Sequence, residues 1–277
     1  MSSEMCDPIS SFRAYIAAVN SRDWPSVASW LQPAFSYNQA TAHEYLAEMQ
    51  EMVNAMPDLS ITIDQLFADK RSPAIFARIV KAGTLTKSFM DMEPAGRQFE
   101  FWELCFCQFE DGKVKHIRAT QPAQQMQIQA ESVPRTPFES GFFENLPERA
   151  DDLGDWFKSN LFGIASGNVR ETLLKNAAPE VLFNGTQRVS VERIIESNLT
   201  VQEAARGLHI EIDALVVDEK HQRVGCVYNV IGEVAKDFKT FKVGQTGISC
   251  KFVIHYRDAN GKKAAMWSIM DSERSFY

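Results

Sequence analysis

Glu103 is a carboxylate in an unusually apolar segment of the chain. It follows Trp102 within residues 98–109, which alternate like a β-strand. A carboxylate in an apolar pocket can take a proton from a carbon next to a carbonyl group, because burial tunes its pKa for that transfer. Glu103 is therefore a candidate general base. A surface ion pair with Arg78 or Arg118 is the alternative.

Asp271 is a second candidate base, near the C-terminal end of the sequence. Residues 263–270 also alternate, and the period of two places Trp267, Ile269 and Asp271 on one face of the expected strand. An aspartate that is solvated at the strand end, or that caps a loop, is the alternative.

Other catalytic chemistries find no support in the sequence. The five histidines are scattered without the spacing of metal ligands, and the five cysteines form no CxxC pair. There is no phosphate-binding loop, dinucleotide fingerprint or Gly-x-Ser-x-Gly elbow. We therefore expect neither a metal nor a cofactor, and we expect the cysteines to be buried thiols in a reducing compartment.

The composition is typical of a folded protein with two domains. The chain has 277 residues, of which 45% are hydrophobic and 23% are charged, and its net charge is −7. This negative charge disfavours binding to nucleic acid or to an anionic membrane. The sequence contains no apolar run of about 18 residues and no signal-like N-terminus, so we expect a cytoplasmic protein without a membrane span.

The elements that must position the carboxylates follow one plan in each half. Helical spacing of apolar residues comes first, and alternation with a period of two follows. The expected helices span residues 11–19, 24–31 and 42–56, and then 153–165, 169–176 and 191–205. The expected strands span residues 59–63, 75–81, 98–109 and 114–120, and then 209–216, 223–231, 248–256 and 263–270. Helices that precede an antiparallel sheet predict an α+β fold.

The two halves are related by an internal repeat. Residues 83–89 and 232–238 share a glycine, a lysine and a phenylalanine at an offset of 149, and residues 61–64 have partners at the same offset. A period of this size is a whole domain, far above that of a solenoid repeat. We predict domain 1 at residues 1–125, a linker containing glutamine and proline at 126–148, and domain 2 at 149–277.

Several strings in the first half carry a family resemblance. Residues 15–23 are similar to the opening helix, residues 56–61 to the entry of the first long strand, and residues 96–101 with 109–114 to the central hairpin of one family. That family is the nuclear-transport-factor-2-like (NTF2-like) superfamily, in its SnoaL-like cyclase and ketosteroid-isomerase branches. The resemblance implies two tandem cone-shaped α+β barrels, each with three helices packed on a curved antiparallel sheet. It specifies chemistry poorly, because this fold hosts isomerases, cyclases, hydrolases, dehydratases and binding modules.

The resemblance also implies roles for individual residues. The last strand of the family carries a tryptophan and, four residues later, an aspartate that faces the cavity, and Trp267 and Asp271 match this pattern. The first half has Gln121 at the aspartate position, which can hold a carbonyl or a water but cannot act as a base. Tyr15 occupies the place of the oxyanion tyrosine of the ketosteroid isomerases, with a core tyrosine as the alternative.

His255 depends on the register of its strand. The family's pocket often has an acid or a histidine where this chain has Cys105 and, by the offset of 149, Ile254. A slip of one residue in the hairpin would bring His255 onto the pocket face. Otherwise it is a half-buried histidine with satisfied hydrogen bonds.

The complete set of expected site residues is therefore short. The catalytic candidates are Asp271, Glu103, His255 and Tyr15, and the substrate-binding candidates are Trp267, Gln121, Arg78, Asn38, Trp102 and Tyr256. For Asn38 the alternative role is turn formation, and for Arg78 it is a surface ion pair.

These residues and the resemblance lead to a functional expectation. We expect a cofactor-independent enzyme of secondary metabolism, a cyclase, isomerase, dehydratase or hydrolase, that acts on a small apolar metabolite of polyketide or terpenoid type. The alternative is a non-catalytic module that binds a lipophilic ligand or a protein partner. Single cones of this fold pair through their sheets, so we expect either a monomer that is an internal pseudo-dimer or a homodimer, with only one cone active.

Overall fold

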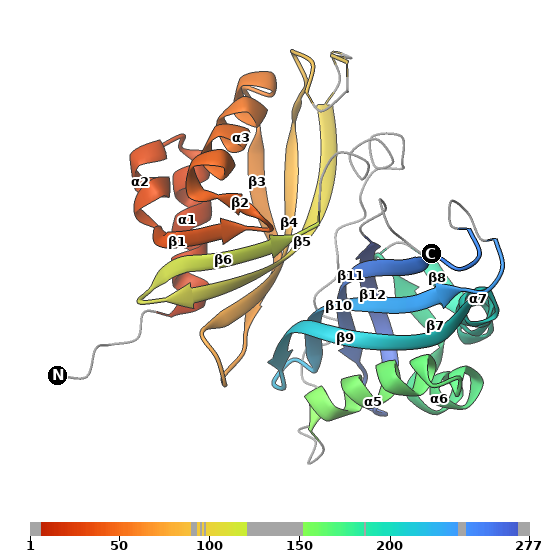
Figure 1. Ribbon diagram of the computed structural model, residues 1–277. Coiled ribbons are helices and arrows are strands. Elements are labelled where there is room, and N and C mark those ends of the chain that lie inside the picture. The colour runs from red at the N-terminus through yellow and green to blue at the C-terminus, as the bar shows by residue number, and fades with distance from the viewer. Residues whose placement is uncertain are drawn as a thin grey trace. The chain divides into compact units, whose positions relative to one another are not determined.

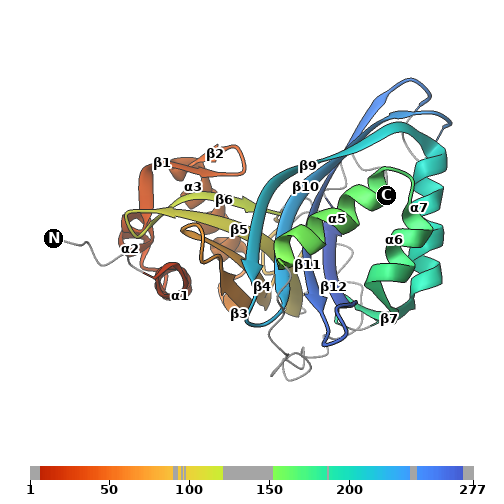
Figure 2. The same ribbon diagram turned by 90° about the horizontal axis from the view of Figure 1, so that it is seen from below.

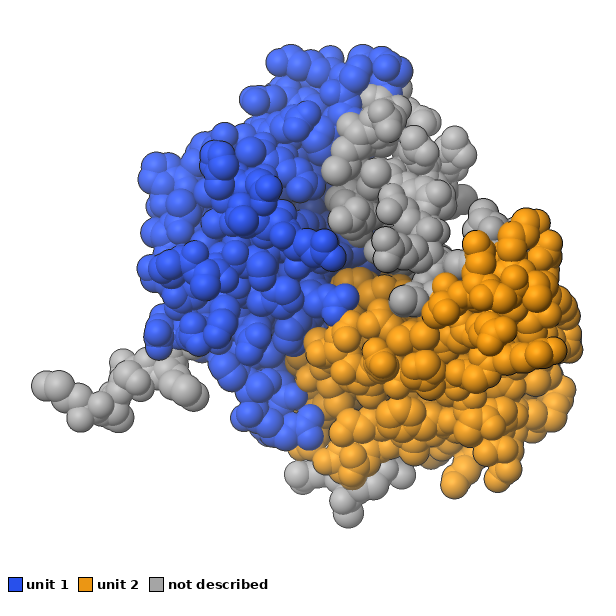
Figure 3. Space-filling view, in the orientation of Figure 1, with its two compact units in different colours: residues 1–134 blue, residues 135–277 orange. Residues whose placement is uncertain are grey.

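The computed structural model describes residues 7–89, 93–94, 96, 98–120, 152–185, 187–237 and 242–270. The chain forms two compact units, residues 1–134 and residues 135–277 (Figure 3). Each unit combines helices with one six-stranded sheet, which confirms the predicted α+β class (Figure 1). The predicted domain boundaries at residues 125 and 149 lie outside the described residues and stay predictions.

Unit 1 has its helices on one face of a mixed sheet (Figure 1). Its elements are α1 (Pro8–Asn20), α2 (Trp24–Ser29), β1 (Leu31–Tyr37), β2 (Ala40–Thr41), α3 (Ala42–Ala55), β3 (Ser60–Ala68), β4 (Ala74–Thr84), β5 (Gln98–Glu110) and β6 (Lys113–Ala119). The strand order is β2-β1-β6-β5-β4-β3. The pairing of β1 with β6 is parallel, and the other pairs are antiparallel.

Local sequence signals fix the ends of these elements. Helix α1 begins after Asp7, whose side chain accepts from two backbone N–H groups of the first turn. Helix α3 begins with a capping box, in which Thr41 and Glu44 satisfy each other's backbone N–H groups. The β5–β6 hairpin turns at Asp111 and Gly112, which have φ angles of 51° and 73°. These angles match the Asp-Gly turn that the sequence predicts.

Unit 2 repeats this architecture. Its elements are α5 (Leu153–Ala165), α6 (Val169–Asn176), β7 (Ala177–Phe183), β8 (Gln187–Ser190), α7 (Val191–Ala204), β9 (Ala205–Asp218), β10 (Arg223–Val234), β11 (Thr246–Arg257) and β12 (Lys263–Met270). The strand order β8-β7-β12-β11-β10-β9 is the order of unit 1. Helix α5 lies across the sheet and buries Phe157 and Leu161 against it (Figure 2). None of the helices among the described residues combines the length and apolar character that a membrane crossing needs.

The two sheets match strand by strand, at offsets that differ slightly from one strand to the next. Ile117 pairs with Tyr37 in unit 1, and Met266 pairs with Phe183 in unit 2, so Ile117 and Met266 correspond at the offset of 149. On the neighbouring strand, Cys107 pairs with Ile117 while His255 pairs with Met266. His255 therefore corresponds to Cys107 at an offset of 148.

Candidate active site

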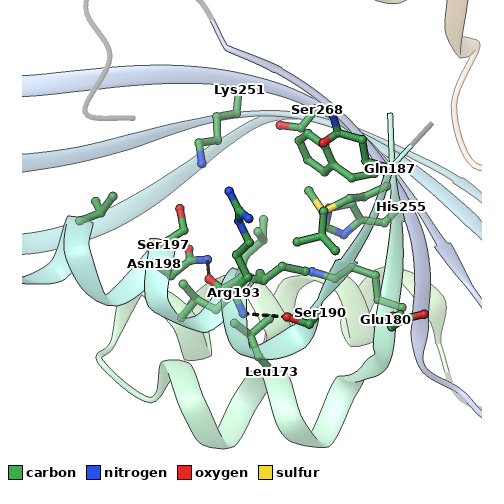
Figure 4. A pocket seen from close by; sticks show the side chains of 18 of the residues that line it. Leu173, Glu180, Gln187, Ser190, Arg193, Ser197, Asn198, Lys251, His255 and Ser268 are labelled. Carbon is green, nitrogen blue, oxygen red and sulfur yellow. Dashed lines mark hydrogen bonds between the residues drawn. The ribbon is translucent and has the colours of Figure 1, made fainter. Parts of the chain in front are cut away.

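Unit 2 contains a large cavity between its helices and the inner face of its sheet. The cavity has a volume of about 1220 Å³ (Figure 4). Its lining includes apolar residues of α5 and α7 and polar residues of β8, β11 and β12. This is enough space for a metabolite of the size that protein pockets usually bind.

His255 lies in the wall of this cavity. It sits on β11, is only 6% exposed, and its ring lies edge-on to Phe157 at 5.1 Å between centroids. The Nε2 atom has no hydrogen-bond partner among the described residues. Burial, together with the nearby charges of Lys263 and Lys251, holds the pKa of His255 well below its usual value. The imidazole is therefore neutral at neutral pH.

Two lysines flank His255 in the same cavity. Lys251 lies four residues before it on the same face of β11, and Lys263 lies at the start of β12. Burial lowers the pKa of Lys251 to about 7, with a further contribution from the charge of Lys263. Burial alone lowers the pKa of Lys263 to about 8. Both amines are thus poised to gain or lose a proton near physiological pH.

The opposite wall is polar and positively charged. Helix α7 contributes Arg193, Ser197 and Asn198, and β8 contributes Arg188. Glu180 is the only carboxylate among the described residues that line the cavity. A chain with a net charge of −7 therefore has a cavity in which cationic groups outnumber the anionic one.

The interior of unit 1 is closed by comparison. A cavity of only about 20 Å³ remains at the corresponding place, lined by residues that include Tyr15, Tyr37, Tyr45, Lys81 and Glu103. The Glu103 carboxylate lies 2.5 Å from the Lys81 ammonium and accepts a hydrogen bond of 3.2 Å from the Tyr37 hydroxyl. Tyr15 and Tyr45 share a hydrogen bond between their hydroxyls. Burial raises the pKa of Tyr15 and of Tyr37 well above the usual value, so both stay neutral.

The comparison with known protein families concerns this first unit. The model of the SnoaL-like polyketide cyclase family matches residues 10–127. Unit 1 is a SnoaL-like domain. Unit 2 has the same strand order and the same sequence of helices, as a tandem arrangement requires.

Each of two matches to solved structures covers about half of the chain. AclR from Streptomyces galilaeus is 20% identical, with a TM-score of 0.42, and the match covers 48% of this chain and 91% of AclR. A SnoaL-like polyketide cyclase from Agrobacterium tumefaciens is 20% identical, with a TM-score of 0.41, and the match covers 45% of this chain and 98% of that one. No curated protein sequence matches the chain.

Two of the expected residues in the SnoaL-like unit 1 point away from its interior. Arg78 forms an ion pair with Asp64, and its guanidinium lies 4.8 Å from the centre of the Trp102 ring. Arg78 pairs across the sheet with Leu104, so it lies on the face opposite Glu103. The partner of Glu103 is therefore Lys81, and neither Arg78 nor Trp102 lines the cavity of unit 1.

Asn38 has a structural role. It has a φ angle of 51°, and its side-chain oxygen accepts a hydrogen bond of 3.0 Å from the Ala119 N–H. Asn184 repeats this arrangement in unit 2 with the Ser268 N–H, at 2.9 Å. The asparagine that recurs in both halves thus ties the end of one strand to the next, which is the turn-forming alternative.

The structure does not bring Trp267 and Tyr256 to the cavity of unit 2. Their rings lie edge-to-face, 5.4 Å apart, on the sheet face opposite His255. Met266 and Ser268 line the cavity in place of Trp267. Asp271 and Gln121 lie outside the described residues, and their roles stay predictions.

Sequence reasoning missed the two lysines and the two arginines of the cavity. Lys251 and His255 are four residues apart on one strand, which is the period-two signal of a shared face. The constant offset of 149 concealed that signal, because it aligned Ile254 with Cys105. Arg193 carried no signal, since a charged residue in the first turn of a helix is usually a solvated one.

Proposed function

We propose that the chain is a cofactor-independent enzyme that moves a proton on a small ketone of polyketide or terpenoid type, and that unit 2 is its catalytic unit. The observation that carries this proposal is the Nε2 atom of His255, buried and without a partner in the described structure, in the wall of a cavity of about 1220 Å³. A neutral imidazole in that setting is a general base.

The proposed step begins with proton transfer from carbon to nitrogen. The lone pair of His255 Nε2 takes a proton from the carbon next to a substrate carbonyl, and the electrons of the C–H bond move to the carbonyl oxygen as an enolate. The Lys263 ammonium stabilises this oxygen. The new negative charge also offsets the lysine charges that depress the pKa of His255, so the imidazolium forms more easily as the reaction proceeds.

The enolate can then complete either of two reactions. In an isomerisation of a β,γ-unsaturated ketone, the enolate extends over the double bond as a dienolate, and the imidazolium returns its proton to the γ-carbon. In a cyclisation, the enolate carbon attacks a second carbonyl of the same molecule, and the imidazolium protonates the resulting alkoxide. Both restore neutral His255 and need no external reactant.

In this proposal unit 1 has a structural role and no catalytic one. Its carboxylate is neutralised by Lys81 and bonded to Tyr37, and the space beside it holds no metabolite. Glu103 is therefore a poor base in this setting, because its buried charge is already compensated.

Exchange of carbon-bound hydrogen for deuterium tests the proposed step. We expect the protein to accelerate exchange at the carbons next to the carbonyl of 2-decanone in D₂O, followed by NMR. His255→Gln should reduce the rate by about 100-fold or more, within the range for removal of a general base. His209→Gln, a change at an exposed histidine of the same unit, is the matched control and should leave the rate unchanged.

Two results would contradict the assignment. Retention of exchange in His255→Gln with loss in Asp271→Asn would transfer the role of base to Asp271. Binding of 2-decanone without any exchange by the wild type would leave the non-catalytic lipophilic-ligand module as the better account.

A further inference from the structure

Arg193 lies at a position of helix α7 where a positive charge is unfavourable. Ser190 caps α7, which makes Arg193 the third residue of the helix, and the Arg193 N–H donates to the Ser190 hydroxyl at 3.3 Å. At the same position of the equivalent helix α3, unit 1 has Glu44, which completes a capping box with Thr41. A cation in the first turn is unfavourable because this end of a helix carries a partial positive charge. Unit 2 therefore has a destabilising arginine where unit 1 has a stabilising glutamate.

The arginine faces another cation across the cavity. Figure 4 shows Arg193 extending from α7 towards the side of the cavity that holds Lys251. The Arg193 side chain makes no ion pair among the described residues. Two positive groups on facing walls, with Glu180 the sole described carboxylate of the lining, form a binding site for an anion.

His255, at the reacting end of the cavity, lies at a distance from this anion site. Lys251 and His255 are four residues apart on β11, which is a distance of roughly 13 Å between their backbones. A ligand that reaches both must be elongated, with an anionic group at one end and the reacting carbonyl towards the other. A carboxylate suits the planar fork of an arginine, which can bind both of its oxygens.

We infer that the ligand of unit 2 is a keto acid, whose carboxylate is bound by Arg193 of α7 and Lys251 of β11. The ketone end of this assignment rests on the proposed function, whereas the carboxylate end rests on the cationic lining alone. The substrate class is thereby narrowed from an apolar metabolite to one that carries a free acid.

Calorimetric titration with a matched pair of neutral and anionic probes tests the carboxylate site. Decanoate and decanamide have the same chain length and differ in charge. We expect the wild type at pH 6.5 to bind decanoate at least about tenfold more tightly than decanamide, as one charge-assisted contact would give. Lys251→Met and Arg193→Gln should each remove most of this preference and leave the affinity for decanamide unchanged.

Matched surface variants control for the loss of charge. Lys220→Met and Arg206→Gln each remove one exposed positive charge from unit 2 and should keep the full preference for decanoate. Equal affinity of the wild type for both probes, binding of neither, or a preference that survives in the double variant Lys251→Met/Arg193→Gln would overturn the inference. The exchange of 2-decanone hydrogens does not depend on the carboxylate site, so failure of this inference and failure of the proposed function are distinguishable.

Discussion

At the scale of single residues, the two units use burial in opposite ways. In unit 1 a buried carboxylate is neutralised by Lys81, and three tyrosines fill the space around it. In unit 2 the residue at the position of Glu103 is Lys251, and the residue at the position of Cys107 is His255. The same fold thus holds a paired carboxylate in one copy and titratable nitrogen atoms in the other. Groups of the second kind are the ones that gather at catalytic sites.

The proposed chemistry makes the exchange rate depend on pH through Lys263. Its pKa of about 8 means that the enolate loses its cationic partner as the pH rises through 8. The pKa of His255 is well below its usual value, so the base also remains neutral at lower pH. The other charged groups that face these two are Lys251, Arg188, Arg193 and Glu180. We expect the rate of 2-decanone exchange to be level between pH 6 and 7.5 and to fall above pH 8.

Substitution of the lysine tests this assignment. Lys263→Met should lower the rate about 100-fold, as removal of one oxyanion donor does, and should abolish the fall above pH 8. Lys220→Met, the surface control, should keep both the wild-type exchange rate and its fall above pH 8. A fall of the wild-type rate on the acidic side, centred near the ordinary histidine pKa of about 6.5, would contradict the depressed pKa of His255.

The buried ion pair of unit 1 predicts a loss of stability. Lys81→Met leaves the Glu103 carboxylate buried without its counter-charge, which should lower the free energy of unfolding by about 3–5 kcal/mol. The double variant Lys81→Met/Glu103→Gln should recover most of this loss, because a neutral amide replaces the uncompensated charge. Urea unfolding measures both values. Lys115→Met, which breaks an exposed pair with Glu110, is the control and should have little effect. An equal loss in Lys81→Met and Lys115→Met would contradict the role of burial.

At the scale of elements, the sequence predicts the fold more reliably than the direction of its side chains. The helices and strands of both halves are found close to their expected ranges, because apolar periodicity reports burial directly. The inward direction of Glu103 also follows from alternation with Cys105 and Cys107. The partner of Glu103 does not follow from this alternation. Arg78 and Lys81 are three residues apart on β4 and so lie on opposite faces, and the pairing of β4 with β5 decides which of them shares the face of Glu103.

The register of β11 shows why the candidate site is harder to predict. A shift of one residue in the offset exchanges the faces of a whole strand, so Ile254 points away from the cavity while His255 points into it. Nothing local in the sequence marks that shift. It is fixed by the pairing of β11 with β10 and β12, which are distant interactions.

The first turn of α7 allows stability and binding to be separated. Arg193→Glu should create the capping box that α3 already has and should stabilise unit 2 by about 0.5–1 kcal/mol. The same change should abolish the preference for decanoate over decanamide, since it replaces a cation with an anion. Thermal unfolding and calorimetric titration measure the two effects.

The mirror-image change in unit 1 is the control. Glu44→Arg should destabilise α3 by a similar amount and leave the affinity for decanoate unchanged, because Glu44 does not line the cavity of unit 2. If Arg193→Glu destabilised the protein, or if it kept the preference for decanoate, the view that Arg193 is retained for binding would be wrong.

At the scale of the whole molecule, duplication has allowed one copy to specialise. The hydrophobic clusters built around Phe12 and Phe157 each draw their residues from a single unit, so each unit has a core of its own. The closed interior belongs to unit 1 and the open, cationic one to unit 2. We propose that unit 1 is a stable unit without turnover, and that unit 2 keeps buried titratable groups for its ligand at the cost of its own stability.

This division predicts two thermal transitions that respond to different changes. Decanoate at 100 times its dissociation constant should stabilise unit 2 by about 2.7 kcal/mol, because only the folded unit binds it, and should raise one transition in differential scanning calorimetry. Lys81→Met should lower the other transition and leave the affinity for decanoate unchanged. Arg206→Gln should move neither. A single transition that both the ligand and Lys81→Met shift would show that the units unfold together, and the stability of the catalytic unit would then depend on the ionic cluster of its partner.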